Sequence, residues 1–346
     1  MDLTINDIAR LAGVSKATVS RVMNHKGQIS EATRARVMAV IRENNYHPNA
    51  YAQAVSNQQS RSACIAVVVP HSETYIMANP IFAEIFRGIS DVLTSRGYYS
   101  FSCFTDSEEY LSSLYLQRRV DGLIFLSPTE QEAPLLTKLR ELGVPYVSTT
   151  SYDAAADTGL HIPFADIDNY RAAGLMMAHL TGLGHRYIAF LSADTAAAGE
   201  GKMLSIAARQ RAYTEALEKL GVSPIIETAA HNMMDAGYTA MQALLQRKAR
   251  YTAVFCSTDM LALGAVRAIH DAGLSVPADI SVAGFDGNPW APYMTPALTT
   301  VKQAAYPRGR RAAEMIMDFV ENGEIPDSTV FDAALEIGES TAVCQA

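Results

Sequence analysis

The sequence of 346 residues has little cysteine and no long apolar run. Its four cysteines (Cys64, Cys103, Cys256 and Cys344) show no C-x-x-C spacing, which argues against a zinc site or a disulfide framework, so we expect four small buried side chains. No apolar stretch approaches the ~20 residues that a membrane-spanning helix needs. The N-terminus also lacks the basic start and apolar run of a signal peptide. We therefore expect a cytoplasmic protein.

Signatures of catalysis are also missing. Residues 199–202 (GEGK) resemble part of a phosphate-binding loop, but Ala196 stands in place of its first glycine and Met203 in place of Ser or Thr. The chain has no Gly-x-Ser-x-Gly elbow, no His-Glu-x-x-His pair and no third glycine of a dinucleotide fingerprint after residues 182–184. Its eight histidines show no metal-ligand spacing. We expect neither an enzyme nor a bound cofactor or metal.

What the sequence does contain is enough apolar material for sizeable cores. Hydrophobic residues make up 49% and charged residues 18%, which is typical of a folded globular chain and not of a disordered one. At roughly 150 residues per domain, the length favours two or three domains.

Charge is divided unevenly along the chain. Residues 1–60 hold seven Lys or Arg against four Asp or Glu, so this part carries +3 while the whole chain carries -8. A basic N-terminal part joined to an acidic remainder can face phosphate groups while the remainder has another task.

Residues 4–24 (TINDIARLAGVSKATVSRVMN) have the pattern of two short helices joined by a tight turn. Apolar residues recur at helical spacing up to Ala12, Gly13 interrupts them, and Ser15 is a good N-cap for a second helix. A third helix begins after Ser30. This is the pattern of a helix-turn-helix, whose second helix lies in the DNA major groove, although polarity alone would also fit an ordinary surface hairpin.

After residue 60 the pattern changes to apolar runs that alternate with amphipathic stretches, which is typical of parallel sheets covered by helices on both faces. Residues 46–60, poor in bulky apolar side chains, predict a linker. The expected strands are 64–69, 122–126, 187–191, 253–256 and 280–285, and the expected helices are 82–95, 203–220, 236–246 and 259–272. We predict a small all-α helix-turn-helix head and an α/β body of two doubly wound parallel-sheet subdomains.

Taken in order, these features resemble the LacI/GalR family of bacterial transcription regulators over nearly the whole chain. Further matching segments are 46–49 (YHPN), 79–85 (NPIFAEI), 120–124 (VDGLI), 184–188 (GHRYI), 259–265 (DMLALGA), 276–286 (VPADISVAGFD) and 296–301 (PALTTV). The resemblance implies a sugar-responsive repressor whose body has a periplasmic-binding-protein-like fold. The alternative is a sugar-binding transport receptor-like protein without a DNA role, and the basic N-terminal part argues against it.

The resemblance also implies which residues contact DNA. Lys16, Ala17 and Arg21 match the positions that read bases; Arg21 can reach guanine O6 and N7, and the Ala17 methyl can pack on a thymine methyl. Positions that match backbone contacts are Thr4, Ser15, Thr18, Asn24, Ser30, Thr33 and Tyr46. In the family, residues that match 49–57 form a hinge helix whose leucine enters the minor groove. Here that position is Val55, a shorter and β-branched side chain.

Six residues match the family's effector contacts, in a cleft between the two subdomains: Phe82, Thr150, Arg209, Asn232, Thr258 and Asp286. Arg209 and Asp286 can bind adjacent hydroxyl groups, and Phe82 can stack on a sugar face. Free sugars, disaccharides and sugar phosphates all remain open, with an unphosphorylated sugar or oligosaccharide favoured. For Trp290, the only tryptophan, stacking in the cleft and burial in the hinge are both open.

By resemblance, residues 1–47 form the helix-turn-helix domain, 48–60 a hinge helix or linker, and 61–346 the effector-binding and dimerisation domain. Within the last, the N-terminal subdomain takes about 61–162 and 304–330, and the C-terminal subdomain about 163–303 and 331–346. One head neutralises few phosphates, so we expect a homodimer on a pseudo-palindromic DNA operator. The expected partners are this operator, a small-molecule effector and a second copy of the chain, with no membrane.

Overall fold

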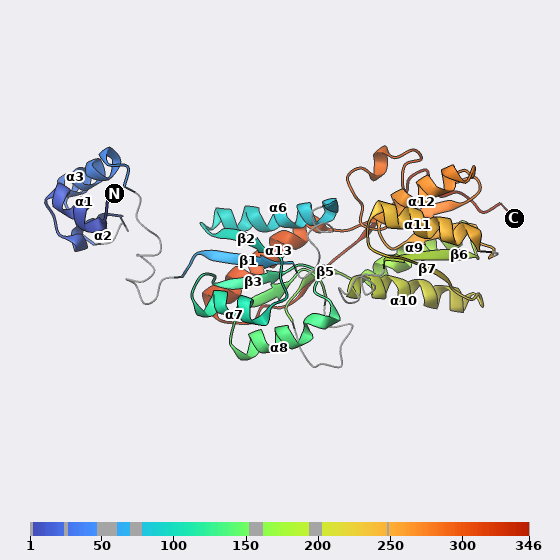
Figure 1. The fold of residues 1–346 in the computed structure, drawn as a ribbon, viewed down its shortest axis with the longest axis horizontal. Helices are drawn as coiled ribbons and strands as arrows, with labels where there is room; N and C mark the ends of the chain where they lie inside the picture. Colours follow the sequence, from blue (N-terminus) through green and yellow to red (C-terminus); the bar gives the residue numbers. More distant parts are fainter. Residues whose placement is uncertain are drawn as a thin grey trace. The chain divides into compact units, whose positions relative to one another are not determined.

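The structure is a computed structural model that describes residues 3–23, 27–46, 61–69, 78–151, 162–193, 203–247 and 249–345. Its internal contacts divide the chain into two units, Met1–Ser62 and Ala63–Ala346, which we name the head and the body. Helices and strands carry the labels of Figure 1. Within the described ranges, no helix is both long and apolar enough to cross a membrane.

The described residues of the head contain the helices α1 (Ile5–Ala12), α2 (Lys16–Met23) and α3 (Glu31–Glu43). Ile8, Val19 and Val37, one from each helix, are fully buried in a common apolar core. Gly13 ends α1 with a φ of 62°, a left-handed conformation that favours glycine, so the chain can turn at once into α2. The predicted helix-turn-helix is confirmed.

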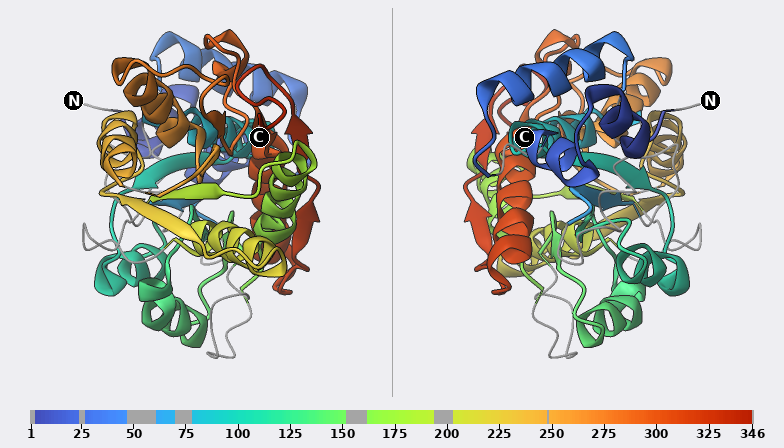
Figure 2. Two further views of the ribbon diagram at one scale, coloured as in Figure 1. Left: turned by 90° about the vertical axis from the view of Figure 1, so that its right-hand side faces the viewer. Right: turned by 90° about the vertical axis from the view of Figure 1, so that its left-hand side faces the viewer.

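The body contains two sheets of parallel strands with helices on both sides (Figures 1 and 2). The first sheet has the order β2-β1-β3-β4 and the second the order β7-β6-β8-β9. The strands of the first are β1 (Cys64–Val68), β2 (Tyr99–Cys103), β3 (Gly122–Phe125) and β4 (Tyr146–Ser148), with helices α6 (Pro80–Ser95), α7 (Glu108–Leu116), α8 (Ala133–Glu141) and α13 (Ala305–Asn322). The strands of the second are β6 (Ile188–Ala193), β7 (Ile225–Ala229), β8 (Ala253–Cys256) and β9 (Ser281–Ala283), with helices α9 (Asn169–Gly182), α10 (Leu204–Lys219), α11 (Met234–Gln246) and α12 (Asp259–Asp271). We name these the first and second subdomains.

Alternation along the central strand explains why helices cover both faces of the first sheet. Ile65 and Val67 of β1 belong to the apolar cluster that includes Ile89 of α6, whereas Ala66 and Val68 belong to a second cluster with residues of α7 and α8. Since successive side chains of a strand point to opposite faces, a run of apolar residues needs a cover on each. The predicted fold class is confirmed.

The chain crosses between the two subdomains more than once, and short paired strands lie at these crossings. β5 (Ala165–Ile167) pairs in parallel with β11 (Thr329–Phe331), and β10 (Thr300–Lys302) pairs antiparallel with β12 (Ala334–Glu336). Helix α13 follows β10 but packs on α6 of the first subdomain. Residues 303–304, between β10 and α13, therefore form one connection between the subdomains.

The expectation of four buried cysteines is wrong for two of them. Cys103 and Cys256 are buried, but Cys64 and Cys344 are only partly buried. Cys64 is the first residue of β1, and Cys344 lies in the C-terminal segment beyond the last strand. Their positions at the ends of packed elements explain the difference.

Candidate DNA-binding face and inter-subdomain pocket

Helix α2 has an exposed polar face that includes the predicted base-reading residues. Lys16, Ala17 and Arg21 are exposed, whereas Val19 and Val22 are buried in the head core. Positions i, i+1 and i+5 share one side of a helix. The structure thus brings these three side chains together on the face that a major groove would receive.

Thr4 caps α1 through a reciprocal pair of hydrogen bonds with Asp7. The Asp7 carboxylate accepts from the Thr4 backbone N–H at 3.0 Å and from its hydroxyl at 2.6 Å. In return, the Thr4 hydroxyl oxygen accepts from the Asp7 N–H at 3.4 Å. The hydrogen bond from the Thr4 side chain holds the pKa of Asp7 below its ordinary value.

The helices α2 and α3 begin in a related way. The Ser15 hydroxyl oxygen accepts from the Thr18 N–H at 3.1 Å, and the Ser30 hydroxyl oxygen accepts from the Thr33 N–H at 3.3 Å. Hydroxyls predicted to meet DNA phosphates thus lie at helix N-termini, where free N–H groups and the helix dipole favour anions.

The remaining predicted DNA contacts have different outcomes. Tyr46 is half-buried and packs against the apolar core of the head, and this burial raises the pKa of its hydroxyl. Asn24 and Val55 lie outside the described residues.

In the body, a pocket lies between the two subdomains and is lined by five of the six predicted effector contacts: Phe82, Thr150, Arg209, Thr258 and Asp286. Three of them follow strand ends, since Thr150 comes after β4, Thr258 after β8 and Asp286 after β9. Carboxyl ends of parallel strands are where α/β sheets present polar side chains to ligands. Asp286 has a φ of 131° and is followed by Gly287, which approaches Lys302 so closely that a Cβ atom would clash.

The sixth predicted contact, Asn232, is not among the residues that line this pocket. It is buried, and its Oδ1 accepts a hydrogen bond of 2.5 Å from the hydroxyl of Thr258. The structure therefore places Asn232 next to a lining residue and in a position to orient its hydroxyl. Trp290 does not line the pocket either; it is half-buried and packs against the apolar core.

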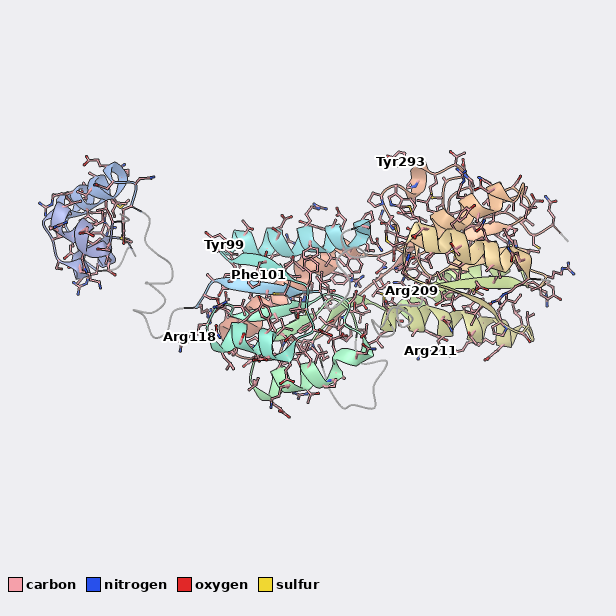
Figure 3. All side chains as sticks on the ribbon, viewed as in Figure 1. Tyr99, Phe101, Arg118, Arg209, Arg211 and Tyr293 are labelled. Carbon is pink, nitrogen blue, oxygen red and sulfur yellow. The ribbon has the colours of Figure 1, made fainter. Side chains whose placement is uncertain are left out.

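Arg209 is buried on α10 and lies where the two subdomains meet (Figure 3). Its Nη1 is 3.5 Å from Oδ1 of Asp286 and donates to the Ser257 carbonyl at 2.7 Å. Its Nε and Nη2 donate to Oδ1 of Asn169 at 3.0 and 2.9 Å. The guanidinium also lies over the Phe285 ring, 3.7 Å from its centroid. Arg209 is therefore held from several sides.

A second buried arginine, Arg308 on α13, completes a closed ring of polar contacts. Its Nη2 is 2.9 Å from Oδ1 of Asp166, and its Nη1 donates to Oε1 of Gln303. Nε2 of Gln303 donates to Oδ1 of Asp286 at 2.6 Å, and Nδ2 of Asn169 donates to Oδ2 of Asp166 at 3.2 Å. We name these six residues the polar ring: Arg308, Gln303, Asp286, Arg209, Asn169 and Asp166.

Sequence reasoning missed four members of this ring: Asp166, Asn169, Gln303 and Arg308. Asp166 interrupts an otherwise apolar strand, Gln303 follows a matched motif, and Arg308 lies in the first turn of α13 beside Ala305. A charged residue within a strand that should be buried is a signal that could have indicated Asp166. No local pattern pairs Asp166 with Arg308, because they are more than 140 positions apart in the sequence.

The pocket is nearly closed, with a cavity volume of about 30 Å³. This is enough for a water molecule or two and far below the several hundred Å³ of a typical ligand site. Around it, the buried Nε of Arg308 has no hydrogen-bond partner, and the Asn79 side chain hydrogen-bonds the Asp286 carboxylate. Ile81, Phe82 and Met203 give the same pocket an apolar side.

Two buried carboxyl groups near the pocket have raised pKa values. Burial raises the pKa of Asp286, against the opposing effect of the Arg209 charge. Burial and then the Asp286 charge raise the pKa of Asp259 to about 7. Asp259 accepts from the Asn288 N–H at 2.7 Å and from the Thr300 hydroxyl at 2.6 Å, so it fixes the loop after Asp286.

A helix-turn-helix head joined to a two-subdomain body with a polar pocket defines a DNA-binding regulator with an effector domain. Comparison with known proteins agrees. Residues 4–49 match the family model of bacterial regulatory proteins, lacI family, and residues 177–341 match the periplasmic binding protein-like domain.

Relatives and solved structures extend this similarity over the whole chain. The catabolite control protein A of Priestia megaterium is 31% identical, over 95% of this chain and 96% of its own. A crystal structure of the lac repressor dimer bound to operator and the anti-inducer ONPF is 26% identical, with a TM-score of 0.84 over 99% of this chain and 100% of that chain. A complex of the transcriptional regulator CelR with cellobiose is 30% identical, with a TM-score of 0.71 over 98% of this chain and 99% of that chain. This chain belongs to the LacI family of transcriptional regulators and is not an enzyme.

Proposed function

We propose that this regulator represses sugar-utilisation genes, and that an uncharged carbohydrate in the inter-subdomain pocket switches its affinity for operator DNA. Support comes from the polar ring. Each of its two guanidinium groups faces a carboxylate, so no cation of the ring is left for a phosphate group. A sugar phosphate would need one.

The polar side chains that line the pocket carry the proposal furthest. Asn79 and Arg308 contribute donors, and Asp286 contributes an acceptor. A hydroxyl group both donates and accepts, so a polyol can satisfy both kinds. The apolar side formed by Phe82 and its neighbours fits the C–H face of a sugar ring. We assign the roles of effector contacts to Phe82, Thr150, Arg209, Thr258 and Asp286, with Asn232 orienting the Thr258 hydroxyl.

For the head, we propose that Lys16, Ala17 and Arg21 read bases in the major groove. Thr4, Ser15, Thr18, Asn24, Ser30, Thr33 and Tyr46 are the proposed backbone contacts, and Val55 the proposed minor-groove residue. The exposed face of α2 supports the first set, and the position of capped helix ends supports much of the second. Two heads joined in a homodimer would read both halves of a pseudo-palindromic operator.

The test combines ligand and DNA binding on the full chain. Thermal unfolding is followed with glucose, ribose, cellobiose and glucose 6-phosphate, since a ligand that binds only the folded state raises its Tm. We expect a neutral sugar to raise the Tm and to change the affinity for an operator selected from random duplex DNA. A response to the phosphorylated sugar alone would overturn the proposal.

Asp286→Ala is the matching variant. It should remove the sugar response while circular dichroism shows an intact fold, because Asp286 offers a carboxylate acceptor in the pocket. An Arg140→Ala variant on the exposed face of α8 serves as the control and should respond like the wild type. A normal sugar response in Asp286→Ala would remove this carboxylate from the site.

A further inference from the structure

Gln303 lies in the short connection between β10 of the second subdomain and α13 of the first. Its side chain is 8% exposed and lines the nearly closed pocket. It also lines a second cavity of about 470 Å³, whose other residues include Pro289, Ala305 and Tyr306. Gln303 thus lies between the two cavities, together with Ile81 and Asp286, which also line both.

The Gln303 carboxamide makes two hydrogen bonds of opposite polarity. Its oxygen accepts from the Arg308 guanidinium, and its nitrogen donates to the Asp286 carboxylate at 2.6 Å. Two adjacent hydroxyl groups of a sugar offer the same pair, an acceptor towards the cation and a donor towards the anion. Arg308 Nε, beside these contacts, has no partner and can bind the same diol.

We propose that Gln303 is a built-in substitute for the effector. In the closed pocket it occupies the place of two adjacent effector hydroxyls, and a bound sugar displaces it towards the second cavity. The inference rests on the proposed function in taking this pocket as the effector site. The exchange adds the volume of the carboxamide to the pocket of about 30 Å³.

The exchange also couples effector binding to the contact between the two subdomains. The Gln303 carboxamide bonds Asp286 of the second subdomain to Arg308 of α13, which packs with the first. A diol that replaces it takes over both partners and releases the connecting segment. Gln303 is therefore a positioning residue that sets how readily the pocket accepts a vicinal diol.

Chemical rescue tests the exchange without knowledge of the effector. We expect Gln303→Ala to unfold about 5 °C lower than wild type, because two buried charged groups lose a partner. Acetamide and 1,2-ethanediol should each restore part of this loss relative to their effect on wild type, whereas ethanol, with one hydroxyl, should not. Gln303→Leu fills the space with an apolar group and should show no rescue. If Gln303→Ala does not fold, Gln303→Ser takes its place.

Rescue by acetamide alone would overturn the inference, since the site would then accept a carboxamide but not a diol. Absence of any rescue would overturn it as well. Rescue by both probes in the small variant and by neither in Gln303→Leu would support it.

Sugar titrations provide the second readout. For glucose, ribose or cellobiose, whichever binds wild type, Gln303→Ala should bind about tenfold more tightly, because the competing side chain is gone. Weaker or unchanged affinity would contradict the inference and make Gln303 an effector contact or a bystander. If no sugar binds either protein, the proposed function fails, while the rescue experiment still decides the role of Gln303.

Discussion

Arg21 is an exposed cation on a helix whose opposite side is buried in the head core. Its long side chain extends into solvent from a fixed backbone, because the buried Val19 and Val22 hold the helix on the head core. The polar ring has the opposite character, since its charged groups are buried and hold one another. We therefore expect substitutions in the head and in the polar ring to affect DNA binding and effector binding separately.

Arg21→Ala is expected to weaken operator binding by about 1–3 kcal/mol, the usual cost of losing a bidentate contact to guanine. Gel-shift titration on a selected operator measures the loss. Arg140→Ala, an exposed arginine of the body, should leave operator affinity unchanged. Equal affinities of Arg21→Ala and wild type would show that Arg21 does not contact the operator.

Asp259 predicts a pH dependence of stability. Burial raises its pKa in the folded state to about 7, while the unfolded chain releases the proton near 3.8, the ordinary pKa of an aspartate. Between these values the folded state holds one more proton, so this group's contribution to the free energy of unfolding falls as pH rises from about 4 to 7. Asp259→Asn cannot ionise and should lose this decline.

Urea unfolding at pH 5, 6, 7 and 8 measures the effect as the difference between wild type and Asp259→Asn. The free energy of unfolding of wild type, relative to that of Asp259→Asn, should fall as pH rises to about 7 and then become constant. A difference that does not vary with pH would mean that Asp259 is ionised throughout.

At the scale of elements, side-chain caps at their N-termini stabilise the head helices α1 and α3. Ser30 caps α3 through the Thr33 N–H. Ser30→Ala should destabilise this helix by about 1 kcal/mol, seen as roughly fivefold faster hydrogen exchange of α3 amides. Ser30→Asn, which can still cap, should exchange like wild type. Unchanged exchange in Ser30→Ala would show that the cap does not limit the opening of α3.

The sequence predicted the central strands and several long helices of the body, namely β1, β3, β6, β8, β9, α6, α10, α11 and α12, but missed the other described elements, β2 among them. Its residues, Tyr99 to Cys103, alternate between aromatic and serine side chains at the edge of the sheet, and Tyr99 and Phe101 are exposed (Figure 3). An edge strand has less apolar surface to bury, so periodicity identifies it less readily than the central β1.

For the whole molecule, we predict a dimer as the unit that binds operator DNA. Sedimentation of the full chain at micromolar concentration should give the mass of two chains, because one head makes too few phosphate and base contacts for specific binding. A mass near four chains would refute this prediction. The predicted domain boundaries, including those between the subdomains, likewise stay predictions.

The sequence by itself determined the helix-turn-helix, the alternating α/β pattern of the body and the family. These depend on local spacing: apolar periodicity, capping residues and turn glycines act within a few residues of one another. Resemblance to the family also identified Arg209 and Asp286, at positions that match its effector contacts.

Only the tertiary structure decided that Arg209 and Asp286 belong to a closed ring. Asp166 lies in β5 and Asn169 at the start of α9, whereas Gln303 precedes α13 and Arg308 lies in its first turn. Their contacts depend on how distant segments pack, and buried charges are stable together only because each finds its counter-charge there. Spacing along the chain carries no record of such pairs, so the partners of Arg308 and the closure of the pocket emerge only from the fold.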